Sequence, residues 1–185
     1  MTFAGAVLAG GRSSRMGRNK ALLRLAGEPL WRHQQRVLKE AGANPIWIVQ
    51  APGQRALTRS VIRDTVRDAG PLAGLHASLV HCDHGHVAVL AVDLPFIDQA
   101  WWVRLAKLCS PGIGVVARTR AGYEPLAAIY PCEGRAEAAM RLAKGEFALQ
   151  KFVTALVRSR RLRVLHLQSA DRWHLANWNM PCDVS

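Results

Sequence analysis

Short apolar runs alternate with amphipathic segments from one end of the chain to the other. Val87–Val92 is apolar at every position, which is typical of a strand buried on both faces. Strands are predicted over Ala4–Ala9, Ala21–Leu25, Pro45–Gln50, Val61–Arg63, Val87–Val92, Ile113–Ala117, Tyr123–Tyr130 and Leu162–Leu167. Helices are predicted over Pro29–Ala41, Leu72–Cys82, Asp98–Cys109, Glu133–Ala143 and Glu146–Arg158.

This alternation predicts an α/β fold, a three-layer Rossmann-like domain with a mostly parallel central sheet and helices on both faces. A chain of 185 residues, half of them hydrophobic, is long enough for one full core, so we expect a single domain over residues 1–185. In such folds ligands bind outside the carboxyl ends of the strands. Residues that directly follow strands are therefore the first candidates for a functional site.

Hydropathy and cysteine usage indicate the compartment. No uncharged stretch is long enough to span a bilayer, and Met1–Phe3 leads into the first predicted strand without a targeting segment. A cytoplasmic protein that does not associate with membranes is expected. In that reducing compartment a disulfide framework is not expected, and all four cysteines are predicted to be free thiols: Cys82, Cys109, Cys132 and Cys182.

The formal net charge of +12 favours an anionic partner. Most of the cations are arginines spread along the chain, and one dense run consists of Arg158, Arg160, Arg161 and Arg163. No aromatic residues interleave with this run. The run therefore favours a solvated helix end followed by an edge strand over a nucleic-acid-binding patch.

A glycine-rich loop follows the first predicted strand. It begins with Gly10 and Gly11 and carries several cations, among them Arg15 and, at its end, Lys20. Consecutive glycines allow backbone N–H groups to approach a ligand closely, and cations in the same loop can neutralise phosphates. The spacing matches neither G-x-x-x-x-G-K-[ST] nor G-x-G-x-x-G, so it indicates another kind of phosphate-binding loop. The alternative is a glycine turn with incidental surface cations.

Asp93 directly follows the most apolar of the predicted strands, and Leu94-Pro95 ends that strand. A carboxylate in this position needs a cation or hydrogen-bond donors to offset its desolvation. Because Mg²⁺ binds one or two carboxylates together with phosphate oxygens, Asp93 is predicted to be a magnesium ligand. The alternative is a helix N-cap, for which Asp98 is the better candidate.

Five elements of the chain have distinctive residues and spacing. They are Leu8–Lys20 as L-A-G-G-x-S-x-R-M-G-x-x-K, Gly27–Leu30 as G-x-P-L, Asp64 with Gly70–Gly74 as D…G-P-L-A-G, Asp93–Phe96 as D-x-P-F, and Asn177–Pro181 as N-x-N-M-P. In this order they resemble the molybdenum cofactor guanylyltransferase family, whose N-x-N-T-P element the last one approximates. The resemblance covers almost the whole chain and implies a GT-A-like, nucleotide-diphospho-sugar transferase-like fold.

The resemblance also implies a reaction: transfer of GMP from GTP to molybdopterin, which releases pyrophosphate and forms the guanine dinucleotide cofactor. By the same resemblance, Leu8, Ala9 and Gly10 line the nucleotide. Gly11 lets the backbone close on phosphate. Asp64 binds the nucleotide, and a carboxylate suits guanine because the N1 and N2 donors of the base face it.

For catalysis the resemblance implies that Arg15 and Lys20 neutralise the β- and γ-phosphates that leave, and that Asp93 holds Mg²⁺. Asn177 and Asn179 face the acceptor or complete the metal site. Positioning and charge neutralisation suffice for such chemistry without a covalent intermediate. GTP and molybdopterin are the implied substrates, and proteins of molybdenum insertion and molybdoenzyme maturation are the implied partners.

Two other functions stay open. A relative that transfers CMP to the same cofactor usually reads L-A-A-G, so Gly10-Gly11 favours guanine. A non-catalytic nucleotide- or nucleic-acid-binding module, supported by the arginine run, would bind RNA or DNA with a steep salt dependence that survives loss of Asp93. The segment His81–His86 resembles a metal cluster, but it lacks a zinc-binding spacing and is expected to be a polar surface loop.

Overall fold

The computed structural model describes residues 2–10, 19–59, 61–64, 66, 68–83 and 85–176. Within these residues seven strands form one sheet in the order β5-β4-β1-β6-β8-β7-β9, and two short strands form a separate hairpin. The sheet strands are β1 (Ala4–Leu8), β4 (Ile46–Gln50), β5 (Val61–Arg63), β6 (His86–Ala91), β7 (Gly114–Thr119), β8 (Gly122–Pro131) and β9 (Leu162–His166), and the hairpin strands are β2 (Arg24–Leu25) and β3 (Glu28–Pro29).

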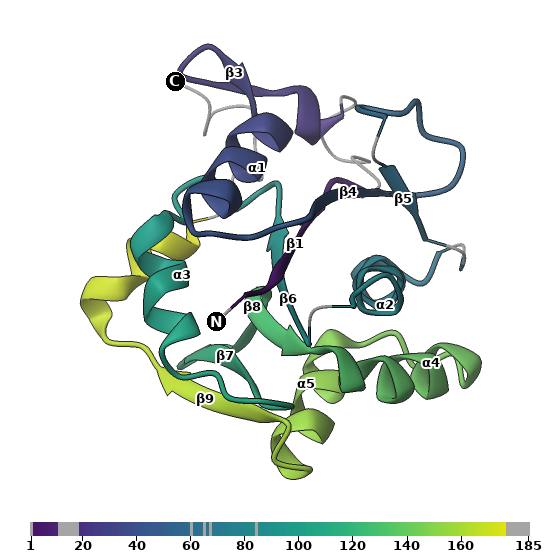
Figure 1. The fold of residues 1–185 in the computed structure, drawn as a ribbon, viewed down its shortest axis with the longest axis vertical. Helices are drawn as coiled ribbons and strands as arrows, with labels where there is room; N and C mark the ends of the chain where they lie inside the picture. Colours follow the sequence, from purple (N-terminus) through teal and green to yellow (C-terminus); the bar gives the residue numbers. More distant parts are fainter. Residues whose placement is uncertain are drawn as a thin grey trace.

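Helices cover both faces of the sheet. The α-helices are α1 (Leu30–Glu40), α2 (Pro71–Val80), α3 (Gln99–Ala106), α4 (Arg135–Ala143) and α5 (Leu149–Arg158), and the 3₁₀ helices are η1 (Lys20–Leu22), η2 (Cys132–Gly134) and η3 (Ser169–Leu175). Helices α1 and α3 lie on one face, and α2, α4 and α5 lie on the other (Figure 1). The predicted α/β class is confirmed. No helix in the described ranges is long and apolar enough to cross a membrane.

Six of the seven sheet strands run in the same direction. The pairs β1–β4, β1–β6, β4–β5 and β7–β9 are parallel, whereas β8 is antiparallel to both of its neighbours, β6 and β7. The carboxyl ends of the six parallel strands therefore lie along one edge of the sheet, which we call the carboxyl edge; the opposite edge is the amino edge.

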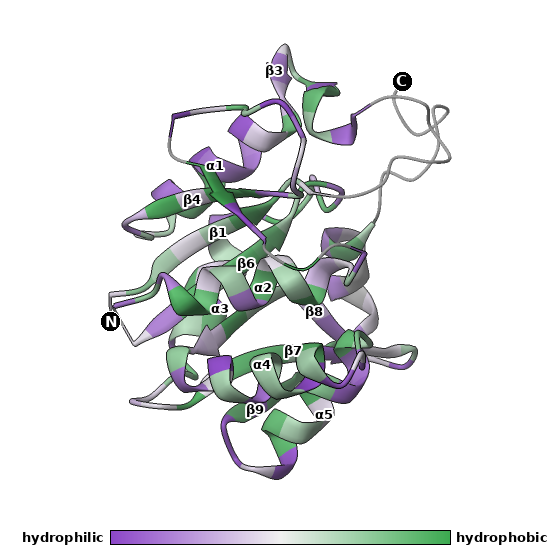
Figure 2. Ribbon diagram, turned by 90° about the vertical axis from the view of Figure 1, so that its right-hand side faces the viewer, coloured by the Kyte–Doolittle hydropathy of each residue, from purple (hydrophilic) through white to green (hydrophobic). Residues whose placement is uncertain are grey.

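Each face of the sheet has its own apolar core. Leu38 and Trp102 pack against one face, and Leu72 and Phe152 against the other; all four side chains are fully buried. Hydrophobic residues are concentrated along the strands (Figure 2). Burying one such side chain stabilises the fold by about 1.5–3 kcal/mol, so the two cores hold the sheet and its carboxyl edge in place.

The segment after the glycine-rich loop differs from its predicted extended form. Asn19 accepts a hydrogen bond from the backbone N–H of Ala21 at 3.0 Å and so caps the 3₁₀ helix η1. The chain then reverses through Ala26 and Gly27, both with positive φ, at +48° and +84°. Only Arg24–Leu25 of the predicted strand is extended, because a side-chain cap outweighs the weak strand preference of a short segment.

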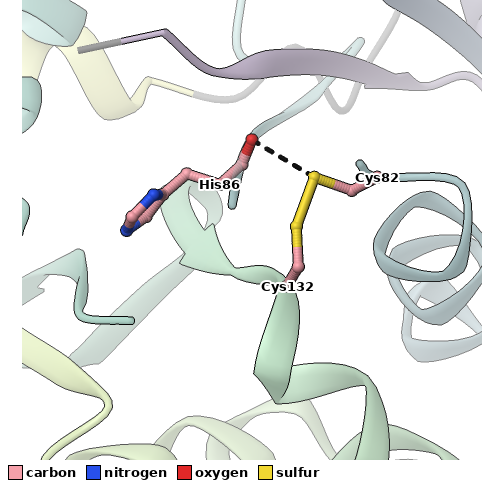
Figure 3. The surroundings of a disulfide bond; sticks show 3 residues. All are labelled: Cys82, His86 and Cys132. Atoms are coloured by element: carbon pink, nitrogen blue, oxygen red, sulfur yellow. Dashed lines mark hydrogen bonds between the residues drawn. A yellow bond between two sulfur atoms is a disulfide. The ribbon is translucent and has the colours of Figure 1, made fainter. Parts of the chain in front are cut away.

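The prediction of four free thiols is wrong for Cys82 and Cys132, which form a disulfide (Figure 3). The antiparallel register pairs the first residue of β6 with the last of β8, and this places the two cysteines side by side at the amino edge with a Cα–Cα distance of 6.2 Å. The Sγ of Cys82 contacts the carbonyl oxygen of His86 at 3.5 Å. Cys109 is free, and Cys182 lies outside the described residues.

Candidate functional site

The carboxyl edge brings together the predicted residues that lie in the described part of the chain. Gly10 follows β1, Asp64 follows β5 and Asp93 follows β6. The strands β5, β4, β1 and β6 are consecutive in the sheet and mutually parallel, so the three residues face the same end of four adjacent strands. This is the position at which α/β folds bind ligands.

Gly10 lies where the chain leaves β1 and crosses the end of β4. Ala9 donates its backbone N–H to the carbonyl oxygen of Val49 at 2.8 Å. A Cβ added at Gly10 would lie 2.6 Å from the backbone nitrogen of Ala51, so only glycine fits without displacing the backbone. The side chains of Leu8 and Ala9 are buried in the core, and what these residues can present to a ligand is mainly backbone.

Lys20 and Asp93 lie close to each other at the carboxyl edge. The Nζ of Lys20 lies 3.8 Å from Oδ2 of Asp93, and the two side chains are 23% and 31% exposed. Lys20 is the first residue of η1, whereas Asp93 lies in the turn after β6, so the pair joins segments that are far apart in sequence. A carboxylate and an ammonium group that both reach solvent here can bind a metal–phosphate ligand together.

Helix α1 forms hydrogen bonds to the backbone of the turn that carries Asp93. The Nε2 of Gln34 donates to the carbonyl oxygens of Ala91 at 3.3 Å and Leu94 at 2.8 Å, one on each side of Asp93. Gln34 is completely buried. Sequence reasoning missed this residue; the signal was a polar side chain at the helical spacing i+4 from Leu30, on the buried face of the helix.

His33, the neighbour of Gln34 in α1, contacts the same turn. Its Nε2 lies 3.1 Å from the carbonyl oxygen of Pro95, and because a carbonyl oxygen only accepts, this nitrogen carries the proton. The other ring nitrogen lies 3.2 Å from Oε1 of Glu28. Arg36 donates to the same oxygen at 2.8 Å and holds the pKa of Glu28 below its usual value. The G-x-P-L and D-x-P-F elements are therefore linked through one imidazole ring.

Asp64 is a partly buried acid at the carboxyl edge. Its backbone N–H donates to the carbonyl oxygen of Gln50 at 3.2 Å, which fixes it beside the end of β4. Its Oδ1 is buried and accepts no hydrogen bond within the described part of the chain. Burial raises the pKa of this carboxyl group, because its charged form is desolvated. A ligand with N–H donors would satisfy this oxygen.

Gln50, the last residue of β4, has a structural role next to Asp64. Its buried side chain accepts a hydrogen bond from the backbone N–H of Leu57 at 3.0 Å and donates to the carbonyl oxygen of Arg55 at 3.1 Å. Arg63 also donates to the carbonyl oxygen of Ala51 at 3.0 Å. These bonds fix the loop that follows β4 beside the site.

The G-P-L-A-G element begins α2 after β5. Gly70 precedes the helix with φ at +62°, and Pro71 occupies the first helical position, which does not require an N–H donor. A Cβ at Gly74 would lie 3.3 Å from Cγ1 of Val49, so α2 packs closely on the sheet there. The element therefore sets the start and the close packing of the helix that borders the site.

The structure rejects the N-cap alternative for Asp93, because Asp98 caps α3. The Oδ1 of Asp98 accepts a hydrogen bond from the backbone N–H of Trp101 at 2.9 Å. The helix η3 lies against α3, held by an ion pair between Arg104 and Asp171 at 2.7 Å (Figure 1). The Nε2 of His174 lies 3.7 Å from Oδ1 of Asp98. The described chain therefore ends close to the start of α3.

Four of the predicted site residues lie outside the described residues: Gly11, Arg15, Asn177 and Asn179. Their neighbours are described. Gly10 and Asn19 border the segment that contains the first pair, and Ala176 precedes the second. The roles of these four residues therefore stay predictions from the sequence.

The basic run lies away from the site. Arg161 and Arg163, at the start of β9, donate to the carbonyl oxygens of Gly112 at 3.4 Å and Leu108 at 2.7 Å. Strand β9 is an edge strand, and its start lies at the amino edge, opposite Asp93. The predicted solvated helix end and edge strand are confirmed, with two arginines bound to the loop before β7.

Mg²⁺ fits the residues at the carboxyl edge. Among the described residues no three His, Cys, Asp or Glu side chains are grouped as a complete metal cage. Mg²⁺ does not need one, because it takes one or two carboxylates, several waters and the oxygens of a substrate phosphate. The partly exposed carboxylate of Asp93 is such a donor, and the neighbouring Lys20 favours anionic phosphate.

Comparison with known proteins finds clear similarity in sequence. Residues 5–161 match the family described as the MobA-like NTP transferase domain. The chain is 51% identical to a probable molybdenum cofactor guanylyltransferase of Opitutus terrae, over 98% of this chain and 92% of that protein. It is 34% identical to a molybdenum cofactor guanylyltransferase of Pseudomonas putida, over 95% of this chain and 92% of that protein.

Solved structures agree on the fold. A molybdopterin-guanine dinucleotide biosynthesis protein A from Archaeoglobus fulgidus has a TM-score of 0.73 at 22% identity, with 100% of this chain and 95% of that one covered. A 2-C-methyl-D-erythritol 4-phosphate cytidylyltransferase from Thermus thermophilus has a TM-score of 0.71 at 16% identity, with coverages of 100% and 96%. The arrangement of the sheet and helices is thus that of nucleotidyltransferases.

Proposed function

Because the chain belongs to the molybdenum cofactor guanylyltransferase family, we propose that it transfers GMP from GTP to molybdopterin, with Asp93 and Lys20 at the reaction centre. The observation that carries this assignment of roles is the 3.8 Å approach of the Lys20 ammonium group to the Asp93 carboxylate at the carboxyl edge. Charges of both signs at one solvent-accessible point suit a metal–triphosphate ligand, which presents both a cation and an anion.

The nucleotide lies, in this proposal, across the ends of β5, β4 and β1. Asp64 accepts the N1 and N2 hydrogen bonds of guanine with its two carboxylate oxygens, of which Oδ1 has no partner in the described chain. Gly10 allows the backbone to approach the nucleotide, since no Cβ projects there. Gly11 and Arg15 continue this surface around the phosphates, and Leu8 and Ala9 support it from the core.

The reaction is an in-line substitution at phosphorus. An oxygen of the acceptor phosphate forms a bond to the α-phosphorus of GTP, and the bond from that phosphorus to the bridging oxygen breaks, so pyrophosphate leaves with the electron pair. Lys20 and Arg15 stabilise the charge that develops on the leaving oxygens. Asn177 and Asn179 orient the acceptor or complete the metal site.

Asp93 holds Mg²⁺ in this proposal. The ion supplies charge neutralisation of the phosphates when bound. Lys20, beside the carboxylate, keeps Asp93 oriented toward the phosphates before the nucleotide arrives. Proteins of molybdenum insertion and molybdoenzyme maturation are proposed to supply the acceptor or receive the product.

One experiment tests the transfer directly. The purified protein is incubated with Mg²⁺, GTP labelled at the α-phosphate and molybdopterin, and the dinucleotide and pyrophosphate are quantified. We expect equal amounts of both products, and neither product when Mg²⁺ or molybdopterin is omitted. Pyrophosphate without the dinucleotide would contradict the proposed acceptor.

Base specificity needs a separate measurement. Thermal unfolding is followed with Mg²⁺ and each nucleoside triphosphate in turn, because a ligand that binds only the native state raises the unfolding temperature. GTP is expected to raise it most. Greater stabilisation by CTP would overturn the guanine assignment and favour a cytidylyltransferase.

A further inference from the structure

We propose that Gln34 is a positioning residue for Asp93. Its side-chain amide reaches from α1 under the turn after β6 and donates both N–H groups to backbone carbonyls, those of Ala91 and Leu94. These two carbonyls bracket Asp93 in sequence, so the amide fixes the backbone from which the carboxylate projects. The proposal extends the proposed function, since it gives this amide the task of presenting the metal ligand.

The chemical environment of Gln34 supports this role. The other buried side chains of α1 are apolar: Leu30, Trp31, Val37 and Leu38. Gln34 is fully buried among them, and its Oε1 accepts no hydrogen bond within the described ranges. An unsatisfied buried amide oxygen destabilises a protein by about 1–3 kcal/mol, so an apolar residue would suit packing better. Within the described residues, the two donated hydrogen bonds are the favourable contacts that glutamine makes and leucine would lack at this position.

The same helix holds the turn at a second point. His33 donates from Nε2 to the carbonyl oxygen of Pro95, two residues beyond Asp93. Lys20, the first residue of η1, approaches the carboxylate itself. The chain between Lys20 and Gln34 therefore contacts the Asp93 turn from its backbone side and its carboxylate side, and Gln34 provides the buried contact.

The test removes the two side-chain N–H donors of Gln34 and keeps the volume of the side chain. Gln34→Met removes both N–H groups, and Gln35→Met is the matched control, because Gln35 is the next residue of α1 and only partly buried. Mn²⁺ is used as the probe, and its binding to the protein with GTP is followed by the electron paramagnetic resonance signal of free Mn²⁺. Circular dichroism and thermal unfolding establish that each variant is folded. Gln34→Leu serves as a second variant if the methionine variant does not fold.

We expect Gln34→Met to weaken Mn²⁺ binding in the presence of GTP by about tenfold to a hundredfold, the range typical of residues that orient a metal ligand. The affinity for GTP without metal is expected to stay within about twofold of wild type. The Mg²⁺ concentration that gives half-maximal transfer is expected to rise in parallel. Gln35→Met is expected to leave all three unchanged.

The outcomes separate this proposal from the proposed function. A folded Gln34 variant that binds Mn²⁺ and GTP like wild type would overturn the positioning role, whether or not the wild type transfers GMP. Weakened Mn²⁺ binding in the Gln34 variant, combined with a wild type that makes no dinucleotide, would support the positioning role and overturn the proposed transfer. Equal losses of Mn²⁺ binding in the Gln34 and Gln35 variants would indicate that the effect is a general destabilisation of α1. That result would also overturn the proposal.

Discussion

The ammonium group of Lys20 and the carboxylate of Asp93 lie 3.8 Å apart, although the two residues are far apart in the sequence. Each comes from a different structural context: Lys20 from a capped 3₁₀ turn, and Asp93 from the end of a fully buried strand. An ion pair between partly exposed groups stabilises a protein by at most about 1 kcal/mol. The significance of this pair is therefore its position at the carboxyl edge rather than its strength.

Replacement of Asp93 tests the metal site. Asp93→Asn removes the negative charge and keeps the side-chain volume, and we expect the rate of pyrophosphate release to fall by about a thousandfold, equivalent to several kcal/mol of lost charge stabilisation. The fold should persist, as judged by circular dichroism. Asp83→Asn is the control, because Asp83 is exposed near the amino end of β6. A fully active Asp93→Asn variant would refute the role given to this residue.

Replacement of Lys20 tests phosphate neutralisation. Lys20→Met is expected to lower kcat by about a hundredfold, the typical effect of removing one group that stabilises transition-state charge. Binding of GMP, which lacks the β- and γ-phosphates, should be unchanged, whereas binding of GTP should weaken. Isothermal titration calorimetry with both nucleotides distinguishes these results. Lys39→Met, on the exposed side of α1, is the control, and an equal loss of GMP binding would contradict the assignment.

Much of the fold was predictable because the strongest local patterns agree with the tertiary structure. The apolar run Val87–Val92 coincides within one residue at each end with the fully buried strand β6, and Asp98 caps its helix as predicted. Gly10 and Asp93 were identifiable because each directly follows an apolar strand. In a parallel sheet that position alone brings distant residues to one edge.

What the sequence did not reveal depends on pairing between distant segments. The direction of β8 is not encoded in its own pattern, and the disulfide between Cys82 and Cys132 follows from the antiparallel pairing of β8 with β6. Gln34 resembles an ordinary polar residue of a helix until the turn after β6 is placed above it. Such roles are set by tertiary contacts, which a single sequence does not display.

Replacement of Gly10 tests the close approach of the chain after β1 to the end of β4. The added methyl group of Gly10→Ala would lie 2.6 Å from the backbone nitrogen of Ala51, and backbone cannot move aside as a flexible side chain can. We expect the free energy of unfolding to fall by about 1–3 kcal/mol, the usual cost of overpacking. Urea denaturation measures this change. Gly134→Ala is the control, because its nearest contact would be 3.4 Å, and an equal loss there would contradict the explanation.

Replacement of Asp64 tests recognition of the base. Guanine presents N1–H and an N2 amino group, whereas hypoxanthine lacks the amino group, so the wild type should prefer GTP to ITP by about tenfold or more, as one discriminating contact of about 1–3 kcal/mol would give. Asp64→Asn should lose most of this preference, because an amide presents only one acceptor oxygen. Competition for transfer between the two nucleotides measures it. An unchanged preference for GTP over ITP in Asp64→Asn would indicate that the base does not bind at Asp64.

The pH dependence of stability gives a second test of Asp64. Burial raises the pKa of its carboxyl group in the native state above the ordinary value, so the native state binds this proton more readily than the unfolded chain. The ionised group therefore destabilises the native protein at neutral pH, and the destabilisation disappears as the pH falls through the raised pKa to the ordinary value near 3.8.

The difference in unfolding free energy between wild type and Asp64→Asn should accordingly shift in favour of wild type as the pH is lowered from 7 toward about 4. Bound GTP, by donating to the buried oxygen, favours the ionised form and should reduce this shift. Urea denaturation across that pH range with and without GTP measures both effects, and a difference independent of pH would contradict the desolvated state of this carboxyl group.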